Sequence, residues 1–270
     1  MMHKQRVSRG DRVFRGGVYS GLAVLVGSLA LVLASVVLYV DWATFSRTIL
    51  SDEIRAAIRL TAITSTITTA LAVVLAVPAG YALSRFRIPG AAIIDTIIDL
   101  PIILPDLVAG IALLVFFTQT ALGQYIDQHI IPFVFTLQGI ILAQFFPAVT
   151  LAVRSMKGAF DAVDPRLEKV ARTLGCDERV AFARVTFPLA RGGLIAGTVL
   201  TWARAAGLFG PIIMFCGATR YKTEVLSIAI FLNMSSGRIE VALAVTVILM
   251  LLGVVTLTLF KRLGGRGYIW

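Results

Sequence analysis

Long apolar stretches alternate with short charged blocks along almost the whole chain. A bilayer core is about 30 Å thick, so a helix needs roughly 20 apolar residues to cross it. Six stretches reach that length: Val18–Val40, Leu60–Leu83, Ile93–Phe117, Ile130–Val153, Gly192–Met214 and Val241–Phe260. The pattern therefore predicts an all-α polytopic membrane protein with about six transmembrane helices.

Three irregularities accompany these spans. Pro101 and Pro105 interrupt the third span, which a buried helix tolerates if its neighbours satisfy the freed carbonyls. A seventh apolar patch, Val225–Leu232, is too short to cross, so we expect it to lie at the interface or to fold back partway. The first apolar run is too long for a cleaved signal peptide, so we interpret it as an uncleaved first span.

Composition agrees with a membrane protein. The chain is 58% hydrophobic and 15% charged, with a mean hydropathy of +0.88, whereas soluble domains are about 45–50% apolar and about 25% charged. A net charge of +10 would suggest nucleic acid in a soluble protein. Here the basic residues stand in blocks between apolar runs, so membrane topology explains them and no nucleic-acid partner is expected.

The basic residues also set the expected orientation. With the N-terminus inside, 18 Lys and Arg residues lie on the cytoplasmic side and six on the other, with Arg204 left inside a span. This bias predicts a multi-pass protein of the cell (inner) membrane with both termini and the loop Arg154–Arg191 in the cytoplasm. The expected segments are a basic cytoplasmic segment (1–17), the first span with an external loop (18–59), a five-span core (60–260) and a cytoplasmic tail (261–270).

Motifs for cofactors and metals are missing from the sequence. Cys176 and Cys216 are expected on loops on opposite sides of the membrane, and His3 and His129 form no ligand cluster with them. No GxxxxGK[ST] loop is present, so we expect no ATP site in this chain. HExxH and GxSxG are absent too, which argues against an enzyme.

The loop Arg154–Arg191 carries the clearest local signals. Asp164 is a good N-cap with Pro165 at the first helical position, and Gly175 is a typical stop. Apolar residues recur along this segment at helical spacing and form one stripe: Phe160, Val163, Leu167, Val170, Ala171 and Leu174. A second short helix is expected over Glu178–Val185. These residues alone leave two readings open, a connector on the lipid surface and a docking surface for a cytoplasmic partner.

This loop resembles that of ATP-binding-cassette (ABC) importer permeases, whose motif reads EAA, three residues, Gly, nine residues, then Ile-x-Leu-Pro. The corresponding residues here are Lys169-Val170-Ala171, Gly175 and Val185-Thr186-Phe187-Pro188. Lys169 and Val170 depart from the motif, whereas Glu168 matches an acid that often precedes it. Three further stretches resemble the molybdate/sulfate branch: Ala72–Gly90, DLPIILPDLVAGIALL and ARAAGLFGPIIMFCG.

The resemblance implies a MetI/ModB-like permease fold and a transport role. It implies a second permease copy, identical or different, two ATP-binding subunits that hold ATP and Mg, and an extracytoplasmic solute-binding protein. The helix in the loop would be the coupling helix, with these docking residues: Leu167, Glu168, Val170, Ala171, Leu174, Gly175 and Pro188. Gly175 is expected to adopt a left-handed conformation, and Pro188 to re-aim the chain into the fifth span.

Charges at membrane depth are costly and are therefore functional candidates. Arg204 would either meet an anionic substrate or pair with an acid of the third span. Asp95 and Asp99 share a helix face near the cytoplasmic end, where water could solvate them, and Asp106 follows the break at Pro105. The expected pathway or gate residues are Arg204, Gly207, Phe209, Gly210, Asp99 and Asp106.

The resemblance favours an oxyanion such as molybdate, tungstate or sulfate as the solute. Leu208 stands where the molybdate branch usually has Glu, and Asp106 where a second proline is common. The alternatives are therefore a permease of the same family for iron, polyamine or thiamine, and an ATPase-independent secondary transporter.

Overall fold

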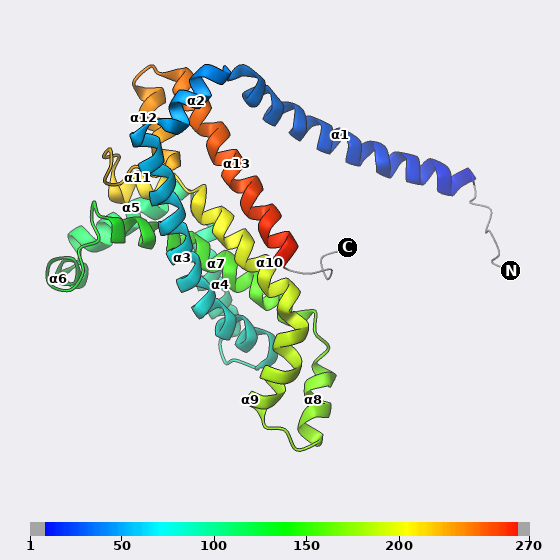
Figure 1. Cartoon of the computed structure of the whole chain (residues 1–270). Coiled ribbons are helices and arrows are strands. Elements are labelled where there is room, and N and C mark those ends of the chain that lie inside the picture. Colours follow the sequence, from blue (N-terminus) through cyan, green and yellow to red (C-terminus); the bar gives the residue numbers. More distant parts are fainter. Residues whose placement is uncertain (1–8, 264–270) are drawn as a thin grey trace.

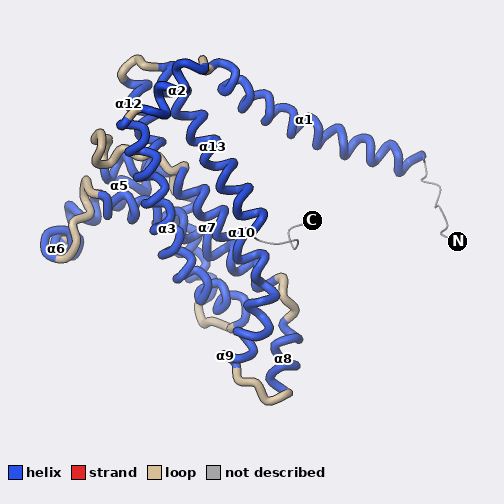
Figure 2. The backbone as a smooth tube through the Cα atoms, in the orientation of Figure 1, coloured by secondary structure: helices blue, strands red, loops and turns tan. Residues whose placement is uncertain are grey.

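The computed structural model describes residues 9–263, and within that range the secondary structure is entirely helical. Figures 1 and 2 show helices joined by short connections. The long helices are α1 (Arg9–Tyr39), α3 (Asp52–Arg85), α7 (Leu137–Asp161), α10 (Phe187–Ala206) and α13 (Ile239–Leu263). The short ones are α2 (Trp42–Leu50), α4 (Ala91–Ile103), α5 (Asp106–Gln119), α6 (Ala121–His129), α8 (Pro165–Thr173), α9 (Glu178–Ala181), the π-helical segment η1 (Phe182–Thr186), α11 (Gly210–Cys216) and α12 (Leu226–Ser235). The all-α prediction is confirmed.

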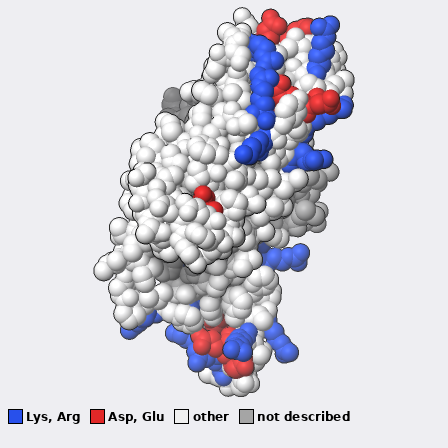
Figure 3. Space-filling model, turned by 90° about the vertical axis from the view of Figure 1, so that its left-hand side faces the viewer, with Lys and Arg blue, Asp and Glu red and all other residues white. Residues whose placement is uncertain are grey.

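The described helices supply the expected number of candidate spans. Four are long and apolar enough to cross a membrane singly, and the count rises to six if each of two bent pairs, α4 with α5 and α9–α10 with α11, is one span. On the face shown in Figure 3, charged side chains gather mainly toward the two ends, and the belt between them is largely uncharged. We name these the α8 end, which carries α8 and α9, and the α2 end, which carries α2 and the start of α3.

Small residues let α3, α7 and α10 pack closely at the centre of the bundle. A Cβ on Gly80 of α3 would lie 2.7 Å from the backbone nitrogen of Lys157 in α7, and a Cβ on Gly197 of α10 would lie 2.6 Å from the Ser155 Cβ. Buried threonines of α3 donate to carbonyls one turn earlier, for example Thr61 to Ala57 at 2.8 Å. These hydroxyls are thereby satisfied without water, as a bundle in lipid requires.

Helix α1 lies apart from this bundle. Figure 1 shows it projecting away from the α2 end, and the apolar window of Phe14–Tyr39 is wholly unburied. Its large apolar side chains, such as Leu31 at 72% and Leu38 at 85%, are exposed along its length. A surface of this kind is stable in lipid or against another membrane subunit.

The third predicted span is sharply bent rather than merely interrupted. The chain bends by 110° between α4 and α5. Leu104 is extended (φ −67°, ψ 133°) and Pro105 caps α5. A residue before proline is pushed out of the helical region, and proline has no N–H to continue the ladder. The chain therefore ends one helix and starts another in a new direction.

Helices α3 and α7 do not begin at the approximate starts expected for the second and fourth spans. Helix α3 begins at Asp52, where Ser51 caps it, so the boundary expected at residue 60 falls inside a helix. Helix α7 begins at Leu137, where the Thr136 hydroxyl caps it, and not at Ile130. It also continues to Asp161, because its last two turns stay packed on α3 at Gly80. Arg154, expected at the start of the loop, is consequently a residue of α7.

The fifth span is an unbroken helical run from Glu178 to Ala206, through α9, η1 and α10, and it bends by 52° into α11. Pro188, which was expected to re-aim the chain into this span, is the second residue of α10. Proline disturbs a helix by clashing with the carbonyl four residues earlier. The π-helical turn η1 immediately precedes α10 and widens the backbone at that point, so helical structure continues through Pro188.

Two smaller expectations concern Cys216 and the short apolar patch. Cys216 is the last residue of α11 and is buried, so it does not lie on a loop. The short apolar patch folds as α12, which packs against α13 and α3 and buries Leu226, Ile228 and Ala229. It is therefore part of the protein core, and whether it lies at the interface or folds back partway stays a prediction.

Candidate functional site

Helix α8 forms where its local sequence predicts. The Asp164 carboxylate accepts a hydrogen bond of 2.9 Å from the Arg166 N–H, and Pro165 is the first helical residue. Gly175 ends the turn at φ +91°, in the region that favours glycine. The Cys176 N–H donates to the Ala171 carbonyl at 3.1 Å and closes the helix end.

One face of α8 is apolar and uncovered. Leu167 is 45% exposed, Val170 56% and Leu174 81%, while Ala171 is half-buried. Figure 1 places α8 and α9 at one end of the molecule. A clustered apolar surface outside the predicted membrane belt is typical of a protein interaction site.

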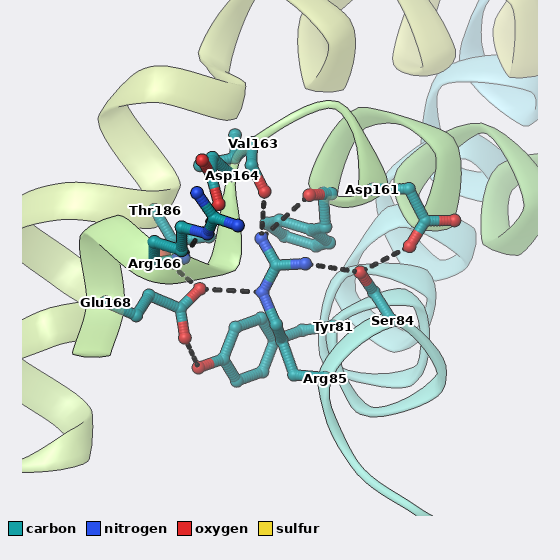
Figure 4. Close-up of polar contacts among 10 residues, drawn as sticks. Tyr81, Ser84, Arg85, Asp161, Val163, Asp164, Arg166, Glu168 and Thr186 are labelled. Carbon is teal, nitrogen blue, oxygen red and sulfur yellow. Dashed lines mark hydrogen bonds and ion pairs between the residues drawn. The ribbon is translucent and has the colours of Figure 1, made fainter.

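Glu168 points in the opposite direction, into the protein. Its Oε1 accepts from Arg85 Nε at 2.8 Å and from the Thr186 hydroxyl at 2.5 Å, and its Oε2 accepts from the Tyr81 hydroxyl at 3.2 Å. Figure 4 shows these side chains converging from α3, α8 and η1. The glutamate therefore fixes the position of α8 against the bundle, while its apolar neighbours face outward.

Arg85 is the hub of this contact. Its Nη2 donates to the carbonyls of Phe160 at 2.9 Å and Val163 at 2.7 Å, and its Nη1 donates to the Ser84 hydroxyl at 3.0 Å. The Arg85 and Glu168 side chains are only 7% and 12% exposed. One guanidinium thus joins the last turn of α3 to the end of α7 and to α8.

The environment keeps Glu168 ionised. Burial by itself raises the pKa of this carboxyl, but the hydrogen bonds from Thr186 and Arg85 and the charge of Arg85 outweigh burial and leave the pKa below its usual value. A charge buried in this way is stable only while its partner is present.

Sequence reasoning missed Arg85 and Tyr81. Arg85 counted only as one positive charge of a cytoplasmic block. Tyr81 packs its ring edge-on against Phe160 and Phe182, with centroids 5.5 Å and 4.6 Å apart. The available signal was Glu168, the one acid of the predicted loop helix. An acid that faces the protein needs a cation as its partner.

Arg204 pairs with Asp106, one of the acids considered for it. Its Nη2 lies 2.7 Å from the Asp106 Oδ1, and the two side chains remain 43% and 37% exposed. Asp106 is the first residue of α5, and Arg204 lies in the last turn of α10. The pair therefore joins the two bent spans next to their breaks.

Asp95 and Asp99 are not simply solvated, so that expectation was wrong. Arg154 donates through Nε and Nη2 to the two carboxylate oxygens of Asp99, each at 2.6 Å, and through Nη1 to Asp95 at 2.8 Å. The two acids share a face of α4 as predicted. They clamp α4, which has no buried residue, onto α7.

The other expected pathway residues surround the second break. Gly207 caps α10, and Phe209, the N-cap of α11, packs its ring on Phe231 at 5.5 Å. A Cβ on Gly210 would lie 2.7 Å from the Asp106 Cβ, so only glycine permits this contact. Leu208 is 1% exposed and belongs to the apolar core, and its carbonyl accepts from Ser227 at 2.7 Å.

Comparisons with known proteins agree with this architecture. The profile of the family described as "Binding-protein-dependent transport system inner membrane component" matches residues 72–266, well over half of the chain. The chain belongs to this family. The permease is 32% identical over 271 residues to the "Probable molybdenum ABC transporter permease protein HVO_B0370" of Haloferax volcanii, covering 98% of each chain.

Two further matches extend the comparison. The permease is 29% identical over 231 residues to the sulfate transport system permease protein CysT of Salmonella typhimurium, covering 84% of this chain and 83% of the relative. Its fold also matches a chain of the crystal structure of a bacterial alginate ABC transporter in complex with alginate pentasaccharide-bound periplasmic protein. That match has a TM-score of 0.75 at 15% identity and covers 96% of both chains. The MetI/ModB-like permease fold is confirmed.

The α2 end of the permease holds a second buried acid. Glu224 is 1% exposed, and its Oε2 accepts from the Tyr221 N–H at 3.3 Å. Glu53 faces it and binds Arg220 at 2.9 Å, with Arg238 at 3.9 Å. Burial raises the pKa of Glu224 and the neighbouring Glu53 carboxylate raises it further, against the lowering effects of the Tyr221 N–H and Arg220.

We expect Glu224→Gln to reduce the pH dependence of the permease's stability. A carboxyl whose folded pKa is raised stabilises fully below its unfolded pKa of 4.5 and loses that contribution as pH rises through the folded pKa. The melting temperature of the wild type should thus fall more than that of Glu224→Gln between pH 4.5 and pH 8. Glu240→Gln, an exposed acid at the same end, is the control, and identical pH profiles for all three proteins would refute the assignment.

Proposed function

We propose that this permease is the membrane subunit of an ABC importer and that it couples solute passage to ATP hydrolysis on separate subunits through α8. The proposal rests on the different contacts that the two sides of α8 make. Leu167, Val170 and Leu174 leave an apolar face uncovered, while Glu168 ties the opposite side of the same short helix to the bundle. The uncovered apolar face of α8 offers a contact to a partner subunit. The link through Glu168 can transmit a movement of α8 to the bundle.

The link reaches the helices that would have to move. Arg85 is on α3, the carbonyls it holds are at and beyond the end of α7, and Thr186 leads without a break into α10. A displacement of α8 by a partner is therefore expected to act on all three central helices together. Rigid-body movement of such helices is a common way to alternate access to a site.

The implied assembly follows from the family. It contains two ATP-binding subunits carrying ATP and Mg, a second permease copy, identical or different, and an extracytoplasmic solute-binding protein. The α8 end then lies in the cytoplasm, and so does the N-terminus. A related transporter of the same fold, whose solved complex includes a periplasmic protein, supports the last partner.

We further propose an oxyanion of the molybdate, tungstate or sulfate type as the solute. The relatives carry names of molybdenum and sulfate permeases at about 30% identity. A half-exposed arginine at membrane depth, Arg204, is compatible with an anion. The other members of the family considered above, for iron, polyamine or thiamine, would carry a cationic or uncharged solute past this arginine.

Reconstitution tests both parts of the proposal. The permease would be expressed with ATP-binding and solute-binding proteins from the same organism, purified, and placed in liposomes for uptake of labelled molybdate and sulfate. We expect a stable complex and uptake that stops without ATP. Purification without any ATP-binding subunit, or uptake driven by an ion gradient alone, would instead identify a secondary transporter.

A further inference from the structure

Three arginines of the central helices, Arg85, Arg154 and Arg204, differ in how many hydrogen bonds their guanidinium groups donate to the protein. Arg85 donates four hydrogen bonds and Arg154 donates four, all to described carboxylates, carbonyls or a hydroxyl. Among the described residues, Arg204 has a single partner, the Asp106 carboxylate, through Nη2 alone. It is also the most exposed of the three, at 43% against 7% and 28%.

An arginine at membrane depth with only one hydrogen-bond partner in the protein needs a polar environment. A guanidinium carries five N–H donors in a planar fork, and leaving most of them against lipid at membrane depth is unfavourable. The exposed side of Arg204 must therefore face water, a polar surface or an anion. Its neighbours support a pathway, because Arg204 and Asp106 stand at the breaks of two bent spans, and broken helices in transporters commonly border the substrate route.

Asp106 occupies the place that an anion would prefer. It is the first residue of the 14-residue helix α5, whose N-terminus has no side-chain cap, and it lies within reach of Arg204. Peptide dipoles make a helix N-terminus weakly positive. The carboxylate is thus held by a cation and by a helix end, as a bound anion would be.

We propose that Arg204 is a transient binding site for the transported oxyanion and that Asp106 is the resident anion displaced from it. This inference rests on the proposed oxyanion substrate. A tetrahedral oxyanion can accept two parallel hydrogen bonds from a guanidinium, whereas Asp106 receives one. Asp106 neutralises Arg204 when the pathway is empty. It also competes with the oxyanion, so the site stays weak enough to release its cargo, as conduction requires.

Substitutions of Asp106 and Arg204 should change the affinity for molybdate in opposite directions. Asp106→Asn removes the competitor, so labelled molybdate should bind the purified complex of permease and ATP-binding subunits up to about fivefold more tightly, the worth of a partly exposed ion pair. Arg204→Gln removes the cation and should weaken binding at least about tenfold. Equilibrium dialysis without the solute-binding protein measures both, with sulfate as a second probe.

Two controls separate a binding site from a structural pair. Glu53→Gln frees Arg220 at the α2 end and should leave molybdate affinity unchanged. The neutral pair Arg204→Gln with Asp106→Asn keeps a hydrogen-bonding contact, so it should assemble and melt like the wild type but lose uptake. A decrease in affinity for both single variants, or normal uptake by the neutral pair, would overturn the inference while the proposed function stands. If wild-type liposomes accumulate neither oxyanion, the substrate proposal and this inference both fail.

Discussion

Arg85→Ala is expected to abolish coupled transport and to loosen the α8 end of the permease. The substitution leaves the ionised Glu168, only 12% exposed, without its cation and removes the donors to two backbone carbonyls. Breaking one side of a buried pair costs about 3–5 kcal/mol. We expect the melting temperature to fall and ATP-driven uptake in proteoliposomes to drop more than tenfold.

The chain offers a matched control for this substitution. Arg87 lies two residues further on and is exposed, so Arg87→Ala should retain uptake and stability. Replacing both partners, Arg85→Leu with Glu168→Leu, removes both buried charges and should recover much of the melting temperature. If Arg85→Ala transports as well as Arg87→Ala, the link from α8 to the bundle does not transmit coupling.

Gly175→Val is expected to uncouple ATP hydrolysis from transport without unfolding the bundle. The residue has φ +91°, and a side chain in the left-handed region costs roughly 1–2 kcal/mol. No atom lies within 4 Å of the position a Cβ would take, so backbone strain is the whole effect. The last turn of α8 should shift and displace Leu174, which caps the helix and is the most exposed residue of its apolar face.

Gly158→Val is the control for that variant. Gly158 lies in α7 near the same end, also has open space around a Cβ, and is not among the glycines with positive φ. We expect it to behave as the wild type. For Gly175→Val, the ATPase rate measured with loaded solute-binding protein should persist while labelled solute uptake falls. Normal uptake would mean that the shape of this turn is unimportant for coupling.

Local signals determined which parts of the fold could be predicted. Hydropathy located the spans, because a helix that crosses a bilayer must be predominantly apolar over about 20 residues. Asp164, Pro165 and Gly175 placed α8, because caps and left-handed turns depend on a few adjacent residues. The helix starts at Asp52 and Leu137 were missed, because each follows a hydroxyl cap that hydropathy does not register.

Long-range pairing explains what the sequence left open. Arg85 and Glu168 are 83 residues apart, and Arg204 and Asp106 are 98 apart. Arg154 was assigned to a loop, so its clamp on Asp95 and Asp99 could not be foreseen from the span boundaries. Which acid meets which arginine depends on how helices cross, and neither periodicity nor charge counting contains that information.

Site-specific photocross-linking tests the central claim, that the outer face of α8 binds the ATP-binding subunit. A photoreactive residue would replace Leu174, which is 81% exposed, in the assembled transporter, with Leu38 of α1, which is 85% exposed, as the control position. The account predicts a cross-link from position 174 to the ATP-binding subunit and none from position 38. An intact, ATP-hydrolysing complex that gives no such cross-link from positions 167, 170 or 174 would contradict it.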